Sequence, residues 1–291
     1  MRIAVLGAGS MGAALAETLL KAGHEVVVYN RTAARLAPLV ALGATSAATP
    51  VEAITAADAS VLVLVDGNAV RETLLGEATR AALRGRKLLN VATTTRTEIV
   101  EIAREVGHNG GDLAEVSITV LPEHVRKSRG QFILGCTVAD EPLWTQLLLS
   151  IGECVQRAGD VGEASNAETP LVAIFMFNFI ATAYAAAMAT KLNVRPAILQ
   201  QALTDNPTMR VTGAGDLLPQ MFARKYSDST ASIDNMSYAA NMAVDAARSL
   251  GMPVKVLEGM AELCAAASKR GLGAKDVAGV FEVLIEPARS S

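Results

Sequence analysis

Short apolar runs alternate with longer amphipathic segments through the first half of the chain. The apolar run Arg2–Leu6 is followed by an amphipathic segment over Ala13–Ala22 and by a second apolar run over His24–Tyr29. Runs of this length are typical of buried strands, whereas the periodicity between them indicates a helix. The alternation predicts an α/β domain with a doubly wound sheet of right-handed βαβ units. Further strands are expected over 60–65, 87–91, 113–118, 131–137 and 154–157, and helices over 68–83, 97–106 and 142–151.

The pattern changes after residue 161, where strand signals almost disappear. Two domains are therefore expected, with residues 1–161 in the α/β domain and residues 162–291 in an all-helical domain joined to it by a long helix. We expect the active site in the cleft between them, outside the carboxyl ends of the strands. Helices are predicted over 167–192, 195–203, 232–250, 254–270 and 276–285, with breakers at Asn206-Pro207, Gly213–Gly215, Gly251-Met252-Pro253 and Gly271–Gly273.

One stretch of the second domain, Leu171–Ala189, contains no charged residue and approaches the length of a membrane-spanning helix. Asn178, Thr182 and Tyr184 interrupt it, so a buried helix is expected and no membrane partner. A helix that is apolar on all sides needs cover that a helical domain of this size does not supply alone. We therefore expect a homodimer that packs the C-terminal helices together.

The first turn contains Gly7-x-Gly9-x-x-Gly12 between a predicted strand and a predicted helix. In this setting the first glycine permits the tight turn, the second lets the backbone approach a pyrophosphate, and the third lets the helix pack close to the strand. The helix N-terminus then offers free N–H groups to the phosphates. The pattern predicts a Rossmann domain that binds a dinucleotide.

The end of the second predicted strand indicates which dinucleotide is bound. A carboxylate about 20 residues after the glycines usually binds the ribose of NAD, but this strand ends in Asn30-Arg31-Thr32. Arg31 can pair with a 2′-phosphate, and Asn30 and Thr32 can donate hydrogen bonds to it. We therefore expect NADPH as the cofactor. The residues that these two motifs predict to bind it are Gly7, Gly9, Ser10, Met11, Gly12, Asn30, Arg31 and Thr32.

Composition restricts the remaining classes of function. Hydrophobic residues make up 51% of the chain and charged residues 19%, so a large core is available. The net charge of −3, without a basic tract, argues against a nucleic-acid partner. Cys136, Cys154 and Cys264 show no metal-ligand spacing and are typical of reduced thiols in a cytoplasmic protein. No metal site is expected.

Three stretches carry a resemblance to a known family. They are GAGSMG with the following GHEVVVYNRT, then Asp66-x-x-Ala69-Val70-Arg71-Glu72-x-Leu74, and then Leu121-Pro122-Glu123. With these motifs the chain resembles the β-hydroxyacid dehydrogenase superfamily and, more narrowly, the NADPH-dependent imine reductases within it. The resemblance implies an NADPH-dependent oxidoreductase with a helical C-terminal domain like that of 6-phosphogluconate dehydrogenase. It also implies that Val65, Asp66 and Thr93 bind the cofactor.

One position departs from the hydroxyacid dehydrogenases of this superfamily. Those enzymes carry a lysine as general acid and base for the substrate hydroxyl, with an asparagine four residues on. The resemblance places Glu168 at the lysine position and Val172 at the asparagine position. Imine reductases often have an aspartate or a tyrosine there, and Glu168 is one methylene longer than aspartate. The substrate-carboxylate motif of the hydroxyacid enzymes is only weakly echoed by residues 114–118.

A carboxyl group at this position suits the reduction of an imine. An iminium ion accepts hydride more readily than a neutral imine, and a carboxylate stabilises that cation and can pass it a proton. A lysine would repel it. Glu168 can also cap the long helix, and the two roles are compatible. Thr93 either lies beside the nicotinamide, as the resemblance implies, or makes hydrogen bonds at a strand end.

Four further residues are candidates for the substrate pocket. Glu115 either adds negative potential for a cationic amine or faces solvent on an edge strand. Ser117 lies two residues further along the same predicted strand. Met176 either lines the pocket or packs in the core, as apolar residues more often do. Tyr238 lies in a region that, by the resemblance, the partner subunit contributes to close the cleft.

The favoured hypothesis is therefore an NADPH-dependent imine reductase acting on a small-molecule imine or amine. The alternative is a β-hydroxyacid dehydrogenase or aldehyde reductase that uses NADP without the usual lysine. A non-catalytic NADP-binding protein is a third possibility, but it would be expected to have an inert residue in place of Glu168.

Overall fold

A computed structural model describes residues 1–191, 193–205, 214–227, 229, 231–249, 251 and 253–286. The chain forms two compact units, Met1–Glu168 and Thr169–Ser291. The boundary expected at 161/162 falls just before helix α9 (Glu163–Lys191), whose first residues, up to Glu168, belong to the first unit. Several predicted helix ends and breakers lie outside the described residues: Leu192, Asn206-Pro207, Gly213, Leu250 and Met252.

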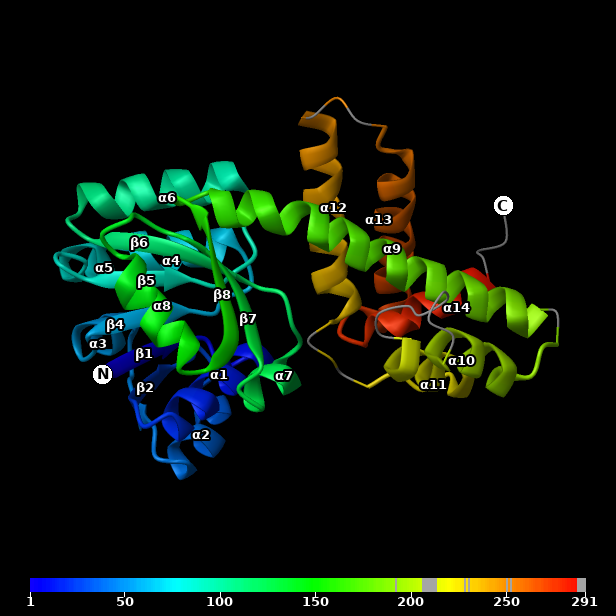
Figure 1. Ribbon diagram of the computed structural model, residues 1–291, viewed down its shortest axis with the longest axis horizontal. Helices are drawn as coiled ribbons and strands as arrows, with labels where there is room; N and C mark the ends of the chain where they lie inside the picture. Colours follow the sequence, from blue (N-terminus) through cyan, green and yellow to red (C-terminus); the bar gives the residue numbers. More distant parts are fainter. Residues whose placement is uncertain are drawn as a thin grey trace. The chain divides into compact units, whose positions relative to one another are not determined.

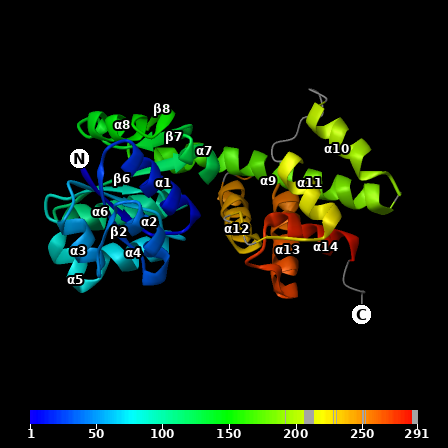
Figure 2. The same ribbon diagram turned by 90° about the horizontal axis from the view of Figure 1, so that it is seen from below.

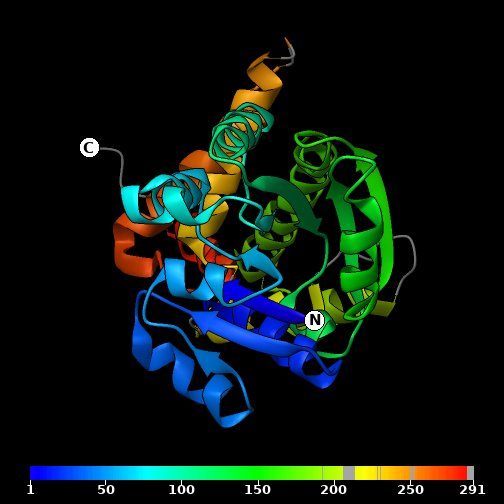
Figure 3. The same ribbon diagram turned by 90° about the vertical axis from the view of Figure 1, so that its left-hand side faces the viewer.

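An eight-stranded sheet forms the middle of the first unit (Figures 1 and 3). The strand order is β3-β2-β1-β4-β5-β6-β7-β8. Because β1 pairs in parallel with both β2 and β4, the order reverses direction at β1, which is where open α/β sheets bind ligands. The strands are β1 (Arg2–Leu6), β2 (Glu25–Tyr29), β3 (Thr45–Ser46), β4 (Ala59–Leu62), β5 (Lys87–Asn90), β6 (Asp112–Ile118), β7 (Gly130–Gly135) and β8 (Gly152–Gly159).

Helices cover both faces of this sheet, so alternate side chains of a strand enter different cores. Ile3 and Val5 pack on one side, and Ala4 and Leu6 on the other. The first side carries α1 (Ser10–Lys21), α2 (Ala37–Ala41), α7 (Pro122–Arg126) and α8 (Glu141–Leu149). The other carries α3 (Pro50–Thr55), α4 (Gly67–Leu75), α5 (Glu77–Ala82) and α6 (Arg96–His108). Figure 2 shows α8 and α3 on opposite sides of the sheet.

The sheet departs from the predicted βαβ pattern at one pair of strands. β6 and β7 are antiparallel, because the short connection over residues 119–129 is too brief for a parallel crossover with a full helix. The helix expected over 68–83 is divided by Gly76, whose extended backbone separates α4 from α5. Several short elements were not predicted, namely η1 (Ala33–Leu36), α2, β3, α3 and α7.

The second unit consists of helices joined by loops in its described residues, with one isolated β-bridge between Ser232 and Asp276. Its helices, after α9, are α10 (Pro196–Asp205), α11 (Ala214–Ala223), α12 (Ile233–Ser249), α13 (Lys255–Ala267), η2 (Ser268–Leu272), η3 (Val277–Gly279) and α14 (Val280–Ile285). α11 was not predicted. These helices enclose a core of their own, to which α9 contributes Met176 and Phe179. Among the described helices, none is both long and apolar enough to cross a membrane.

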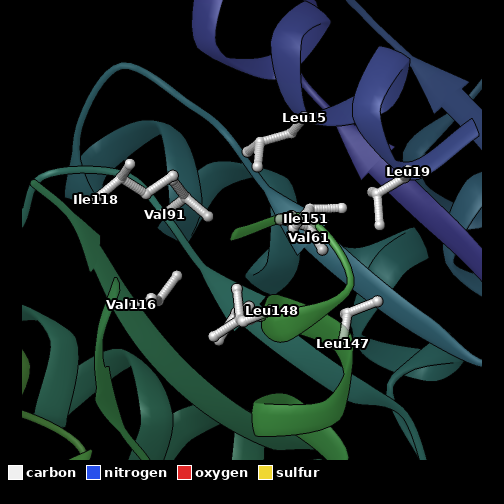
Figure 4. A pocket seen from close by; sticks show the side chains of 10 residues that line it. Leu15, Leu19, Val61, Val91, Val116, Ile118, Leu147, Leu148 and Ile151 are labelled. Carbon is white, nitrogen blue, oxygen red and sulfur yellow. The ribbon is translucent and has the colours of Figure 1, made fainter. Parts of the chain in front are cut away.

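A small cavity lies inside the first unit between α1, the sheet and α8 (Figure 4). Its volume of about 10 Å³ has room for one water at most, and its lining is entirely apolar. None of the candidate catalytic residues lines it, so it is a gap in the core packing and has no part in the site. The lining residues are Leu15, Leu19, Val61, Leu89, Val91, Val116, Ile118, Leu147, Leu148 and Ile151.

Candidate active site

The glycine-rich turn joins β1 to α1 at the carboxyl edge of the sheet, next to β4. Gly7 has a φ of 111°, a conformation that residues with a side chain rarely adopt. A Cβ atom on Gly12 would lie 1.9 Å from the carbonyl oxygen of Gly7. The packing of the chain itself therefore requires glycine at both positions.

Gly9 differs from these two glycines. Its φ of −70° is open to any residue, and a Cβ atom there would meet no described heavy atom within 4 Å. It is exposed and directly precedes Ser10 and Met11, the first residues of α1. No side chain caps this helix, so its first N–H groups have no side-chain partner. The turn therefore leaves the open backbone surface that a pyrophosphate needs.

Asn30 fastens this turn to the loop that follows β2. Its Oδ1 accepts a hydrogen bond from the backbone N–H of Ala8 at 2.9 Å, and its Nδ2 donates to the carbonyl of Thr32 at 2.9 Å. The Asn30 amide carries two N–H donors and the bond to Thr32 uses one of them, so this structural role leaves the expected hydrogen bond to a phosphate open. Its amide holds the loop carrying Arg31 at a fixed distance from the glycine turn.

The loop after β2 is positively charged. Arg31, Thr32 and Arg35 are exposed, and neither arginine forms an ion pair with a residue that the structure describes. No acidic residue occurs between Glu25 and Glu52. An exposed guanidinium with no carboxylate beside it can accept a phosphate in a bidentate manner.

The loop after β4 carries the next two predicted residues. Val65 lies in the loop beyond β4 and is 67% exposed, so it leaves an apolar side chain open to a ligand. The Asp66 carboxylate accepts a hydrogen bond from the backbone N–H of Ala69 at 2.8 Å and thereby caps α4. Asp66 thus fixes the loop, and Val65 is the residue that the loop presents.

Thr93 lies in the loop after β5, which is held by its neighbours. The Asn90 amide bonds both the N–H and the carbonyl of Ala92. Thr95 and Glu98 form a capping box at the start of α6. The Thr93 side chain is half-buried and takes no part in these bonds. Its hydroxyl is therefore the polar group that this loop leaves for a ligand.

Glu168 and Ser117 come together at the carboxyl end of β6. The Ser117 hydroxyl donates to Oε2 of Glu168 at 2.9 Å, and Ser117 itself is buried. Glu168 is half-buried and forms no ion pair with a described residue. Burial raises the pKa of the Glu168 carboxyl, the hydrogen bond from Ser117 lowers it, and the nearby Glu115 charge raises it further. A carboxyl group with a raised pKa can hold a proton and give it to a substrate.

Glu115 lies inside the first unit, with 3% of its surface exposed. Its Oε1 accepts hydrogen bonds from the backbone N–H groups of Gly162 at 2.5 Å, Ala164 at 3.0 Å and Ser165 at 3.4 Å. Its Oε2 accepts from the Ser165 hydroxyl at 2.5 Å. The interpretation that Glu115 faces solvent on an edge strand is wrong, because β6 pairs with β5 and β7. Its carboxylate instead caps the start of α9.

The two remaining candidates belong to the second unit. Met176 has none of its surface exposed and packs in the helical core, so the core-packing alternative applies and the pocket-lining one does not. Phe179 packs edge-on against Phe175, with ring centroids 4.5 Å apart. Tyr238 lies half-buried on α12.

The family described as the NAD binding domain of 6-phosphogluconate dehydrogenase matches residues 2–159, which is more than half of the chain. The chain belongs to this family. It is an oxidoreductase with a domain that binds NAD(P), and the glycine turn and the loop after β2 are the parts of this 6-phosphogluconate dehydrogenase-like fold that fit the cofactor.

Three similar proteins extend the comparison along the chain. The 2-hydroxy-3-oxopropionate reductase of Escherichia coli strain K12 is 27% identical over 209 residues, which are 70% of each chain. A 3-hydroxyisobutyrate dehydrogenase from Salmonella typhimurium has a TM-score of 0.90 at 19% identity, covering 97% of this chain and 99% of the other. An imine reductase from Myxococcus stipitatus in complex with NADP⁺ has a TM-score of 0.69 at 23% identity, covering 98% and 100%. At these identities the two structures show the shared fold.

Sequence reasoning missed the partners that hold Glu115. The Ser165 hydroxyl and the N–H groups of Gly162 and Ala164 lie 47 to 50 residues further along the chain. The one feature of the sequence that points to these partners is the acidic residue itself in an otherwise apolar strand, because a buried acid requires hydrogen-bond donors somewhere in the fold.

The two kinds of glycine in the turn should respond differently to alanine. We expect Gly12→Ala to lower the melting temperature, since its Cβ would overlap the Gly7 carbonyl. We expect Gly9→Ala to keep the stability of the native protein but to weaken dinucleotide binding by about 10-fold or more, since the methyl group occupies the approach of the pyrophosphate. Thermal unfolding with and without NADPH measures both effects. Equal losses of stability in the two variants would contradict this assignment.

Proposed function

We propose that this oxidoreductase is an NADPH-dependent imine reductase, which converts a small-molecule C=N compound to an amine. The observation that carries the proposal is the Ser117–Glu168 pair, a half-buried carboxyl group with no basic residue bonded to it among the described residues. Such a group can protonate an imine nitrogen and then stabilise the resulting cation. A positively charged residue in its place would repel that cation.

The reaction needs one hydride on carbon and one proton on nitrogen. NADPH, held by the glycine turn and the loop after β2, would supply the hydride when bound. Glu168 would give its proton to the imine nitrogen, so that its O–H bond breaks and an N–H bond forms. The carboxylate left behind keeps the hydrogen bond from Ser117 and faces the cation until reduction is complete. A solvent proton then restores the acid.

A second candidate is a β-hydroxyacid dehydrogenase or aldehyde reductase, which the similarity to the 2-hydroxy-3-oxopropionate reductase favours. A protonated Glu168 could also donate to a carbonyl oxygen. The carboxylate of a hydroxyacid substrate would, however, be repelled by the neighbouring Glu115 charge, which already acts on Glu168. This is why we place imine reduction first.

Glu168→Gln tests the acid directly. Glutamine keeps an oxygen for the Ser117 hydroxyl but has no acidic proton, so we expect imine turnover to fall by about 10²-fold or more. The dissociation constant for NADPH should stay unchanged. Glu163→Gln, an exposed carboxyl on the same helix, is the matched control and should keep full turnover. Full imine turnover in Glu168→Gln would remove the acid role.

We also propose that the enzyme prefers NADPH to NADH. Arg31 and Arg35 supply positive charge where the 2′-phosphate of NADPH would lie, and no carboxylate opposes it. A charge-assisted hydrogen bond of this kind contributes about 1.5–3 kcal/mol.

Arg31→Ala should therefore raise the dissociation constant for NADPH by about 10-fold or more and leave that for NADH unchanged. Fluorescence titration of both nucleotides measures the difference. Arg104→Ala, which removes an exposed arginine from α6, serves as the control. A variant that weakens both nucleotides equally would show that Arg31 does not read the phosphate.

We further propose a homodimer through the C-terminal helices. Leu171, Ile174 and Phe177 are 42%, 59% and 44% exposed and follow one another at three-residue spacing on α9. This spacing places them on one side of the helix, and an exposed apolar stripe of this kind is typical of an interface.

Light scattering should give a particle of about twice the chain mass of 30.3 kDa. Ile174→Glu should reduce it to one chain, because the charge would be buried in the interface. Gln146→Glu adds the same charge to an exposed position on α8 and should keep the dimer. A wild-type particle of one chain mass would refute the interface.

A further inference from the structure

Glu115 and Ser117 hold the start of α9 at two successive points. They are two residues apart on β6 and therefore point to the same face of the sheet, about 6.7 Å from each other. Glu115 contacts the first turn through Gly162, Ala164 and Ser165, and Ser117 contacts Glu168 in the next turn. The strand thereby fixes both the position of the helix and the direction of the Glu168 side chain.

The surroundings of Glu115 favour its carboxylate form. All four of its hydrogen-bond partners are donors, three backbone N–H groups and one hydroxyl. Glu168 accepts one hydrogen bond, from Ser117. Of the two neighbouring carboxyl groups, Glu115 is therefore the one whose negative charge is stabilised by the protein.

The neighbouring strand makes room for this carboxylate. A Cβ atom on Gly135 of β7 would lie 2.6 Å from Oε1 of Glu115, so only glycine fits opposite it in the antiparallel pair. The other charges near the start of α9 neutralise each other. Arg96 of α6 pairs with Glu163 at 3.3 Å, and Arg157 of β8 pairs with Asp160 at 3.1 Å. Among the described residues, no cation forms an ion pair with Glu115 or Glu168.

We propose that Glu115 is a positioning residue: as a buried carboxylate it anchors the first turn of α9 and keeps the proton of the pair on Glu168. This inference rests on the proposed function, because it supplies Glu168 with the proton that imine reduction consumes. The two acidic groups lie in different surroundings, so Glu115 carries the negative charge and Glu168 carries the proton.

Burial raises the pKa of both carboxyl groups, and they differ in the hydrogen bonds that oppose it. Burial and the Glu115 charge raise the pKa of Glu168, whereas its single hydrogen bond, from Ser117, lowers it. Burial also raises the pKa of Glu115, but four hydrogen bonds lower it. Removing the Glu115 charge should therefore lower the pKa of Glu168. Since the general acid works in its protonated form, the fall in activity with rising pH should then begin at lower pH.

Carbon-13 NMR titration of the glutamate side-chain carboxyl groups tests the proposal without turnover. The Glu168 signal is assigned by its loss in Glu168→Gln, and that of Glu115 by its loss in Glu115→Gln. In the wild-type protein we expect Glu168 to titrate at higher pH than Glu115. The reverse order would overturn the proposal. The two variants serve only to assign the signals, and the titration itself is carried out on the wild-type protein.

Glu115→Gln then tests the coupling. Glutamine keeps the shape, its carbonyl still accepts from the backbone N–H groups, and its amide can donate to the Ser165 hydroxyl. We expect the pKa of Glu168 to fall, because the like charge that raises it has been removed. The alkaline limb of kcat/KM for a cyclic imine should move down in pH by the same amount. Glu123→Gln removes an exposed charge of α7 that forms no ion pair with a described residue, and it should move neither.

An unchanged Glu168 titration in a folded Glu115→Gln protein would overturn the proposal. The fluorescence of Trp144, the single tryptophan, which is buried in α8 of the first unit, reports whether that unit is folded. If the wild-type protein reduces no imine but the NMR shift appears, the positioning role of Glu115 holds and the substrate assignment fails. The two failures are thereby distinguished.

Discussion

The carboxylate of Glu115 against the first turn of α9 is the contact on which the candidate active site depends. A buried acid on an interior strand of a sheet is costly unless donors surround it. Here the donors are backbone N–H groups that have no partner within the helix because they lie at its start. The carboxylate gains hydrogen bonds from these N–H groups, and they gain an acceptor. β6 and α9 are thereby joined at a defined register, which brings Ser117 to Glu168.

In the rest of the site, too, some residues hold a loop in place and others are left exposed to a ligand. Asn30 fixes the loop after β2 and Asp66 fixes the loop after β4, each through backbone hydrogen bonds. The residues that these loops present, Arg31 and Val65, remain exposed. In the glycine turn, Gly12 serves the packing and Gly9 leaves the surface open. A site of this kind is preorganised, because the groups that face a ligand are held by others that do not.

The sequence predicted the long elements well because their hydrophobic periodicity is a local property. The strand at Arg2–Leu6 has the predicted bounds, and α6 and β6 differ from their predicted bounds by one or two residues. Short elements such as α7 and β3 are too brief to show a period. The antiparallel pairing of β7 and the roles of Asn30 and Glu115 depend on contacts between distant segments, which no local pattern records. The sequence therefore shows that Glu115 is an unusual residue for a strand, but it does not show which groups Glu115 binds.

The chemistry proposed for this oxidoreductase depends on a carboxyl group where a lysine would serve a hydroxyacid. The most direct measurement follows NADPH consumption by the wild-type protein with a panel of cyclic imines, alongside reduction of NADP⁺ with 3-hydroxy acids. Our account predicts imine-dependent oxidation of NADPH and little or no reduction of NADP⁺. Turnover of the hydroxy acids alone would contradict it and would assign the chain to the second candidate function.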